Sequence, residues 1–420
     1  MKIVHPICCG MDVHKKSIVA TLAVTANNIT TYTTRSFITS NPDLINLRTW
    51  LLDHSCHDVC MESSGKYWMP VYNILEAYMS VVLTHPKYVR AIKGKKTDKK
   101  DSKWIADLFK HDLVRASFIP PVQFRASREL ARYRFKLVCM RSSEKNRYQN
   151  AMTVSNITLA NVLSDPFGMT ATDIMHYRLS SDVFDEEHCK KLIQKGAKKK
   201  TELILESIRG SEIRPDQAFK MNEADAHMQF IDAMIIRTEA ELFTRIQPYY
   251  GLVQLLASQL PGLQELSATL ILAETGVDMS VFESAKHFVS WAGLAPTNNE
   301  SAGKKKSTRI SRAGTYLKPL LITCALSAVQ DKKQPYFAIK YARLKKRRGH
   351  KKAIVAIARM MLTCIYHILS TGELFNPSDY EEILSSRKTP LTKHQELNVD
   401  TAIAFLAAQG YDTSSLIKLC

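Results

Sequence analysis

The sequence lacks several features that would assign it to a common class of proteins. It has no run of about 18 uncharged apolar residues, the length that a membrane-spanning helix needs. Its first residues, MKIVHP, carry no apolar core of a secretory signal. Acidic side chains are in deficit, because 40 Asp and Glu face 58 Lys and Arg and leave a net charge of +18. We therefore expect a cytoplasmic protein without a membrane segment that is attracted to a polyanion.

Cysteine is present but lacks the spacing of a zinc ribbon or a disulfide framework. The chain has nine cysteines, an odd number, and the pairs Cys8/Cys9 and Cys56/Cys60 have no matching second half. Two histidines flank Cys56, so a zinc ligand set stays open as an alternative. We expect buried, reduced thiols, which are usual for cysteines in cytosolic strands.

Residues 1–122 predict an α/β layer fold. A β-hairpin is expected from residues 3–11 and 17–24, which are rich in β-branched and small apolar side chains around a polar turn. A further strand is expected at 58–61, a helix at 67–78 and a buried strand at 81–83. Strands that alternate with helices indicate layers of helices on a sheet.

Residues 123–250 predict a long helical arm with a polar insertion. The segment 123–157 has no Gly or Pro, and its apolar residues recur at alternating spacings of three and four; the segment 219–247 repeats this pattern. The two helices would pair either as a coiled-coil arm between subunits or as two packed helices within one monomer. The polar residues 161–215 between them include one expected helix at 186–196.

Residues 251–375 predict a mostly helical domain. Leu260-Pro-Gly-Leu263 lies between two apolar segments and reads as helix, tight glycine turn, helix. Such a hairpin would bind a phosphate through backbone N–H groups, or it would be an ordinary corner between helices. The cluster Lys345, Lys346, Arg347 and Arg348 suits a nucleic-acid backbone, with a solvated basic face as the alternative. Residues 376–420 read as a polar tail with one helix at 399–408.

Four carboxylates occur where a metal site would need them. Asp12 ends a predicted strand, Glu62 ends another, and Asp98 and Asp101 lie three residues apart, one helical turn if a helix begins after Thr97. Each acid alone would more often be a surface residue, but together in a basic chain they predict a site for one or two Mg²⁺ ions, with Mn²⁺ as the alternative ion. The predicted substrate class is nucleic acid.

An ordered set of motifs resembles one known family. The motifs are GMDVHKK at 10–16, MESSG at 61–65, TDKKD at 97–101, LPGL at 260–263, WAGLAP at 291–296 and SAG at 301–303. The sequence resembles the DEDD-type insertion-sequence transposases related to the Piv invertase, over about residues 5–120 and 255–370. The resemblance implies an RNase H-like (RuvC-like) catalytic domain at 1–122 and a C-terminal transposase domain with a helix-hairpin-helix-like element.

The resemblance also implies a catalytic mechanism. The family's acid quartet corresponds to Asp12, Glu62, Asp98 and Asp101, and its nucleophilic serine to Ser301. Such enzymes excise and insert a mobile element, with target and donor DNA and a noncoding guide RNA from the same element as partners. We expect a homo-oligomer, a dimer or a tetramer, because Ser301 must approach the acids within one chain or across subunits.

The residues around Ser301 fit this role. Lys304, Lys305 and Lys306 follow it in a polar loop and would lower the cost of bringing a phosphodiester to a hydroxyl. The family pattern is Ser-Gly, whereas this chain has Ser-Ala-Gly. Ser307, Thr308 and Ser311 are alternative nucleophiles, and a plain surface serine in a turn is the alternative to a catalytic one.

Two other functions remain open. The first is a junction-resolving nuclease that activates water and forms no covalent intermediate. The second is a nucleic-acid-binding protein that is descended from a transposase and no longer catalyses.

Overall fold

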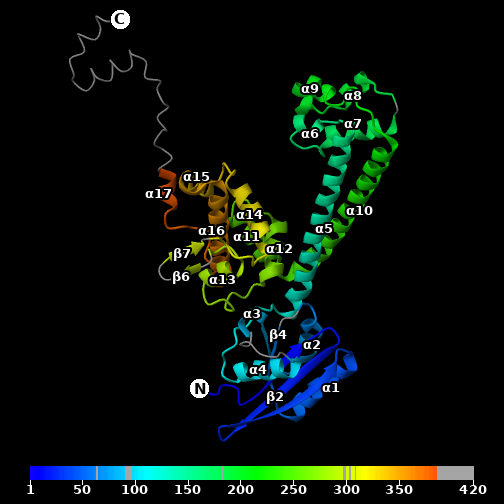
Figure 1. The fold of residues 1–420 in the computed structure, drawn as a ribbon. Coiled ribbons are helices and arrows are strands. Elements are labelled where there is room, and N and C mark those ends of the chain that lie inside the picture. The colour runs from blue at the N-terminus through cyan, green and yellow to red at the C-terminus, as the bar shows by residue number, and fades with distance from the viewer. Residues whose placement is uncertain are drawn as a thin grey trace, which may run out of the picture. The chain divides into compact units, whose positions relative to one another are not determined.

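The computed structural model of the chain describes residues 1–62, 65–89, 97–181, 183–296, 299–301, 304–307 and 309–385. The chain folds into two compact units, and the boundary between them lies after Pro120 (Figure 1). The first unit holds the sheet, and the second holds both the long helices and all later elements.

The first unit is built on a mixed five-stranded sheet of order β3-β2-β1-β4-β5. Its strands are β1 (Ile7–Val13), β2 (Ser17–Ala26), β3 (Ile29–Ile38), β4 (Asp58–Glu62) and β5 (Ser80–Thr84). The first three strands form an antiparallel meander, and β4 and β5 run parallel to β1. The predicted hairpin and the two later strands are confirmed, and this strand order is consistent with the expected RNase H-like layer.

Helices cover both faces of this sheet. They are α1 (Asn41–Asp53), α2 (Trp68–Leu75), α3 (Pro86–Val89) and α4 (Asp98–Lys110). Because successive side chains of a strand point to opposite faces, Met11 joins the core under α1 and α2, while Cys8 joins the core under α4. The even-numbered residues of β1 therefore lie on the face that α4 covers.

In the first unit, β3, α1 and the short helix α3 form where no element is predicted from the sequence. The segment ITTYTTRSFI of β3 shows no apolar alternation, because most of its side chains are exposed on an edge strand. In α1, Leu44, Leu47 and Leu51 are buried at spacings of three and four. This spacing is a helical signal that is visible in the sequence itself.

The cysteines of the first unit are free thiols. Cys8, Cys9, Cys56 and Cys60 are all buried and unpaired in disulfides. Burial raises the pKa of the Cys8 and Cys56 thiols to about 12, so these groups stay protonated and inert at neutral pH. The expectation of buried reduced thiols is confirmed.

Two long helices form an arm in the second unit. The helices α5 (Val122–Val154) and α10 (Pro215–Ile246) pack along each other, with Leu137 against Ile231 and Ile235. Polar pairs also cross between them: Arg134 with Glu239 at 2.6 Å, Arg141 with Asp232 at 2.8 Å, and Glu144 with His227 at 2.9 Å. Residue numbers rise along one helix as they fall along the other, so the pair is antiparallel. The predicted helices are confirmed as a pair within one chain, and a coiled coil between subunits stays a prediction.

The insertion between these helices is a small helical cap with its own core. It contains α6 (Leu159–Val162), α7 (Met169–Ser180), α8 (Glu186–Leu192), a 3₁₀ turn η1 (Lys195–Lys200) and α9 (Thr201–Glu206). Leu159, Ile174, Cys189 and Ile204 are fully buried there. The helix expected at 186–196 is present as α8, but the other short helices were not predicted, because each buries too few apolar residues to show a clear period in the sequence.

The rest of the second unit is mostly helical. After η2 (Gln247–Tyr249) come α11 (Tyr250–Gln259), α12 (Glu265–Thr275), α13 (Ala285–Trp291), β6 (Asn299–Ser301), β7 (Lys304–Ser307), α14 (Leu317–Ala328), α15 (Tyr336–Arg348), α16 (His350–Thr371) and α17 (Tyr380–Ser385). Of the helices described, α16 is the one that is long and apolar enough to cross a membrane by length and composition. It contacts α11, α13, α14 and α15, and Ile357, Met361 and Ile365 are fully buried, as in a core helix.

The turn at Leu260-Pro-Gly-Leu263 joins α11 to α12, as predicted, but it is packed against α14. A Cβ on Gly262 would lie 2.4 Å from the Ala328 nitrogen and 2.5 Å from the Cys324 carbonyl oxygen. Leu260, Pro261 and Leu263 are buried. Gly262 is therefore required by a close helix approach and a φ of 77°, which favours the ordinary corner over the phosphate-binding hairpin.

The start of the predicted polar tail is docked on the second unit. Tyr380 stacks on Tyr336 with ring centroids 5.7 Å apart, and the Tyr336 hydroxyl donates to Asp379 at 2.8 Å. Asp379 also pairs with Lys340. These contacts join residues on both sides of position 375, and the helix expected at 399–408 lies outside the described residues.

Candidate metal centre

Asp12 lies near the end of β1 on the face of the sheet that α4 covers. It shares this face with Gly10 and Cys8, because alternate residues of a strand point the same way. Asp12 is only 6% exposed. An ionised carboxylate in such a position loses hydration, so its position calls for a compensating cation.

Gly10 brings α4 close to this carboxylate. A Cβ at Gly10 would lie 2.3 Å from the Ala106 nitrogen and 2.4 Å from the Ser102 carbonyl oxygen, closer than real atoms approach. The backbone of α4 therefore rests directly on β1 at this position. With any other residue here the helix would have to move away from the sheet, and its first turn would move away from Asp12.

Side-chain contacts hold α4 in register on the sheet. The hydroxyls of Ser102 and Thr21 are hydrogen-bonded at 2.7 Å, fully buried between α4 and β2. Near the other end, Lys110 donates to Tyr32 at 2.8 Å, and Tyr32 donates to Asp107. These contacts fix the direction in which the first turn of α4 points.

The first turn of α4 carries two acids. Thr97 is the N-cap, and its side-chain oxygen accepts from the Lys100 N–H at 3.4 Å, as the sequence predicts. Asp98 and Asp101 both lie in this turn, where the partial positive charge of the helix N-terminus stabilises carboxylates. The sequence places these acids on one face, and the fold places that face beside the sheet.

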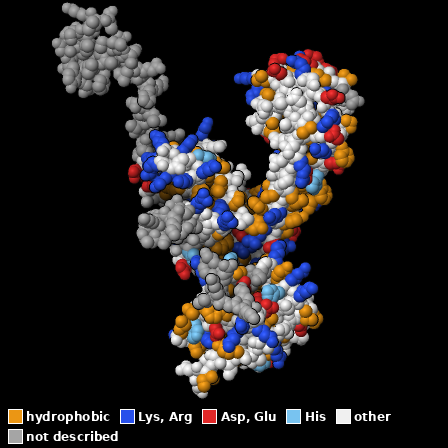
Figure 2. Space-filling view, viewed as in Figure 1, with side chains coloured by type: hydrophobic (Ala, Val, Ile, Leu, Met, Phe, Trp, Pro, Cys, Tyr) orange, Lys and Arg blue, Asp and Glu red, His pale blue; other side chains and the backbone are white. Residues whose placement is uncertain are grey.

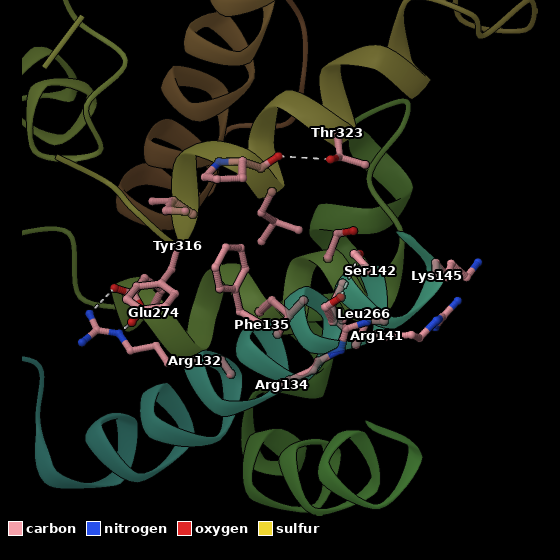
Figure 3. A pocket seen from close by; sticks show the side chains of 17 residues that line it. Arg132, Arg134, Phe135, Arg141, Ser142, Lys145, Leu266, Glu274, Tyr316 and Thr323 are labelled. Carbon is pink, nitrogen blue, oxygen red and sulfur yellow. Dashed lines mark hydrogen bonds and ion pairs between the residues drawn. The ribbon is translucent and has the colours of Figure 1, made fainter. Parts of the chain in front are cut away.

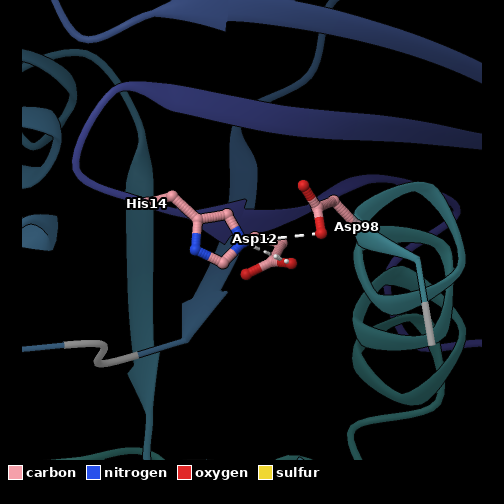
Figure 4. Close-up of side chains that lie close together, drawn as sticks. All are labelled: Asp12, His14 and Asp98. Atoms are coloured by element: carbon pink, nitrogen blue, oxygen red, sulfur yellow. Dashed lines mark hydrogen bonds and ion pairs between the residues drawn. The ribbon is translucent and has the colours of Figure 1, made fainter.

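His14 joins Asp12 and Asp98 into a cluster (Figure 4). Its Nε2 lies 3.2 Å from Asp12 Oδ2 and 3.6 Å from Asp98 Oδ1. One ligand atom from each of the three residues lies within 4.8 Å of the others. His14 has no role predicted from the sequence, although it follows Asp12 by two residues, a spacing that places both side chains on one face of an extended chain.

The electrostatics of Asp12 match a cation site. Burial raises its pKa above the ordinary value of an aspartate, and the negative charges of Asp98 and Asp101 raise it further, while His14 opposes the shift. Asp98 and Asp101 are therefore close enough to Asp12 to repel it. A divalent cation would relieve this repulsion.

Glu62 reaches the same edge of the sheet through strand register. It is the last residue of β4, which pairs in parallel with β1 so that Met61 is opposite Met11. Met61 and Met11 share one core, so Glu62 and Asp12 share the opposite face. Glu62 is partly buried. Among the described residues, the structure brings ligand atoms of Asp12, His14 and Asp98 within 4.8 Å of one another, and Glu62 and Asp101 are not in this group.

These residues fit a hard divalent ion. Carboxylate oxygens are the ligands that Mg²⁺ and Mn²⁺ prefer, and a mix of buried and exposed acids leaves room for water and substrate oxygens. The exposed side of the cluster is Asp98, whose side chain is 55% exposed. Asp12, His14 and Asp98 are the described residues that are close enough together to hold one ion.

Ser301 and the lysines after it form a hairpin in the second unit. Ser301 ends β6, and its register partner on β7 is Lys304; Glu300 is opposite Lys305. The predicted loop is therefore two short antiparallel strands. The hairpin belongs to a different unit from the acids, and the alternative nucleophile Thr308 lies outside the described residues.

The second predicted basic cluster is exposed. Lys345, Lys346, Arg347 and Arg348 form the last turn of α15, and Lys and Arg side chains gather there in Figure 2. Gly349 follows with a φ of 78° and turns the chain into α16. The charges therefore project from a corner between two helices.

Comparisons with known families match the two halves of the chain separately. Residues 9–156 match the model of the DEDD-type IS110 transposases, described as a transposase, and residues 254–342 match the transposase IS116/IS110/IS902 family. The chain belongs to the IS110 family of transposases. As a transposase it acts on DNA, and its DEDD domain indicates dependence on a divalent metal.

Three relatives support this membership. A family 20 transposase of Pseudomonas aeruginosa is 25% identical over 65% of this chain and 71% of its own length. A transposase of Sinorhizobium fredii is 27% identical over 29% of this chain and 32% of its own. A 42 kDa protein of insertion element IS900 from Mycobacterium paratuberculosis is 31% identical over 28% and 30%.

The candidate site residues of this transposase fall into two groups, one in each family match. All four acids and His14 lie within the first match, and Ser301 with Lys304, Lys305 and Lys306 lies within the second. The cap and the whole of α10 lie outside both matches.

Proposed function

We propose that this transposase cuts and rejoins DNA at the ends of an insertion sequence, with Mg²⁺ held by Asp12, Glu62, Asp98 and Asp101. The observation that carries the proposal is the convergence of Asp12 and Asp98 on a shared volume, with ligand atoms within 4.8 Å. The N-terminus of α4 and the buried end of β1 together make this volume. Mn²⁺ is the alternative ion, because His14 adds a nitrogen donor that suits it better than Mg²⁺.

The residues of the site have separate tasks. A bound divalent ion would polarise the scissile phosphate and lower the pKa of the attacking hydroxyl. Asp12 is the buried acid among the four, and the ion would offset the cost of its burial. Asp98 is the exposed ligand that meets the substrate side. His14 holds both carboxylates in place when the ion is absent.

Ser301 is the proposed nucleophile. Its Oγ attacks the phosphorus, a serine–phosphate ester forms, the bond to the displaced nucleoside oxygen breaks, and that oxygen leaves as a hydroxyl. Lys304, on the paired strand, and Lys305 and Lys306 lie within five residues of Ser301 and would offset the charge of the phosphodiester. The reverse attack by a DNA hydroxyl on the ester would rejoin the strand and release Ser301.

Guidance by a noncoding RNA from the same element and assembly as a dimer or a tetramer belong to the same proposal. Both rest on the family resemblance and on the strong positive charge of the chain. DNA and the guide RNA meet in the prokaryotic cytoplasm, where we propose that this transposase acts.

A denaturing gel tests the covalent mechanism. Purified protein, the noncoding RNA that flanks its gene, end-labelled target and donor DNA, and Mg²⁺ are combined and scored for a protein–DNA adduct. We expect an adduct that is lost in Ser301→Ala and in Asp12→Asn and kept in Ser311→Ala. Cleaved DNA without an adduct that persists in Ser301→Ala would instead establish the metal-dependent, junction-resolving nuclease.

A further inference from the structure

A cavity of about 480 Å³ lies in the second unit between α5, α12 and α14 (Figure 3). Its volume is in the range of ligand sites in proteins. All its lining residues belong to the second unit, so the cavity is separate from the metal centre of the first.

The floor of the cavity is apolar and aromatic. Phe135 and Tyr316 meet edge to face, with ring centroids 5.3 Å apart and planes at 81°. Leu266, Leu270 and Leu320 complete the floor, and all five side chains are only partly buried. Aromatic and aliphatic side chains left partly open to solvent favour an occupant with a flat apolar face.

The mouth of the cavity is positively charged. Among its described lining residues, Glu274 is the single acid, whereas four side chains are basic: Arg132, Arg134, Arg141 and Lys145. Arg132 is already paired with Glu274 at 2.6 Å, and its guanidinium lies 4.7 Å from the Tyr316 ring centroid.

The two outer cations of this mouth remain available to an anion. Arg141 pairs with Asp232 at an exposed position, and such a pair is weak in water. Lys145 forms no ion pair with any of the described residues, and its ammonium lies 4.7 Å from the Phe167 ring centroid. An anionic group at the mouth would gain both charges.

Two of the hydroxyls that line the cavity, those of Ser142 and Thr323, offer acceptors to a ligand. Ser142 donates its proton to the Val138 carbonyl at 2.9 Å, and Thr323 donates to the Pro319 carbonyl at 3.1 Å. With their protons committed, these oxygens keep lone pairs for a donor on the ligand. Exocyclic amino groups of nucleobases are donors of this kind.

We propose that this cavity receives one unstacked base of single-stranded DNA, with a neighbouring phosphate at Arg141 and Lys145. The proposal deepens the proposed function by assigning a subsite for the DNA substrate, and it rests on that function. A base supplies the flat apolar face, its amino group meets the hydroxyls, and its backbone supplies the negative charge. Stacking of bases on aromatic side chains beside a basic track is the usual way in which proteins hold single strands. Paired bases in a duplex cannot enter.

A base-selective binding assay tests the proposal. The probe is a short strand of abasic deoxyribose phosphates, with and without one central adenine, bound to full-length Asp12→Asn protein in EDTA so that no cleavage occurs. We expect the adenine to tighten binding at least about five-fold. Phe135→Leu should remove this ratio, whereas Phe230→Leu, an exposed phenylalanine on α10, should keep it.

Two further variants make the test independent of the folding of Phe135→Leu. Ser142→Trp, at an exposed position at the mouth, should block the cavity and also remove the ratio. Lys145→Gln should weaken both probes and reduce the salt slope by about 0.7, the value for one phosphate contact on a single strand. Lys136→Gln, an exposed lysine on the same helix that does not line the cavity, should leave both unchanged.

Each other outcome overturns the proposal. Binding of both probes without an adenine preference, or a preference that survives Phe135→Leu and Ser142→Trp, removes the cavity as a base subsite while the proposed function stands. A preference that only the corresponding RNA strands show reassigns the cavity to RNA. Failure of the Asp12→Asn protein to bind either DNA strand contradicts the DNA binding that the proposed function requires.

Discussion

The position of Asp12 lowers the stability of the folded protein when its carboxylate is ionised. Its pKa is raised by burial and by the charges of Asp98 and Asp101. A raised pKa means that the folded state favours the protonated form, so the stability is complete below the ordinary pKa of an aspartate and decreases as pH rises through the raised value. At neutral pH without metal, the ionised Asp12 therefore destabilises the fold.

We predict that Asp12→Asn raises the melting temperature of the protein in EDTA at neutral pH and abolishes strand exchange, while DNA binding persists. The stabilisation should shrink as pH falls, because Asp12 then becomes neutral in both states. Thermal unfolding with EDTA and with Mg²⁺ measures this. Asp53→Asn, an exposed acid at the end of α1, is the control. A melting temperature that drops in the Asp12→Asn variant at neutral pH would contradict the electrostatic argument.

Gly10 is the residue that lets α4 approach β1. We predict that Gly10→Ala lowers the free energy of unfolding by about 3 kcal/mol, the upper range for overpacking a core, because its Cβ would meet two backbone atoms of α4. It should also weaken metal binding by displacing Asp98 and Asp101. Urea unfolding and Mn²⁺ titration measure the two effects. Gly196→Ala, where no atom lies within 4 Å of the added Cβ, should change neither.

At the scale of elements, α4 is the helix that brings Asp98 and Asp101 to the candidate metal centre. Thr97 starts the helix and fixes both acids in its first turn, which the spacing in the sequence already predicts. The contacts of Ser102 and Lys110 with the sheet then aim that turn at Asp12. The contacts with the sheet thus determine how α4 is oriented and where its two acids point.

Substitutions at the corner between α15 and α16 test whether exposed basic residues bind DNA. We predict that replacing Lys345, Lys346, Arg347 and Arg348 by Gln weakens DNA binding broadly and flattens its salt dependence, by about 0.9 in slope for each phosphate that the variant no longer neutralises. Anisotropy titrations across salt concentrations measure the slope. The matched control is the lysine run of η1, Lys198 to Lys200, replaced in the same way. An unchanged slope would identify the corner as a solvated basic face.

At the scale of the whole molecule, the acids and Ser301 belong to different compact units. Catalysis by both requires that the units meet within one chain or between chains. The arm of α5 and α10 offers a surface for assembly, since Phe219, Phe230 and Ile236 of α10 are each more than half exposed. Large exposed apolar side chains on one helix favour contact with another protein surface.

We therefore predict that the protein forms a dimer or a tetramer when nucleic acid is bound. Light scattering of the complex measures its mass, and Phe230→Glu together with Ile236→Glu should reduce the mass to that of a monomer. Leu203→Glu, at an exposed position on the cap, is the control. A monomer in the complex of the unsubstituted protein would show that the two units act within one chain.

The sequence by itself determined the elements with strong periodicity and the identity of the acids. The hairpin of β1 and β2, the start of α4 at Thr97 and both long helices follow from local patterns, because apolar spacing and capping act over a few residues. The edge strand β3 and the core of the cap were not predictable in this way, since their stability comes from neighbours that are distant in the sequence.

Only the tertiary structure decided how these parts form a site. Contacts between segments far apart in the chain decide three features: the close approach at Gly10, the joining of His14 to Asp12 and Asp98, and the close packing of Gly262 against α14. The same holds for the cavity between α5, α12 and α14. The physical reason is that a carboxylate becomes a metal ligand, and a glycine becomes necessary, only through the atoms that packing places around it.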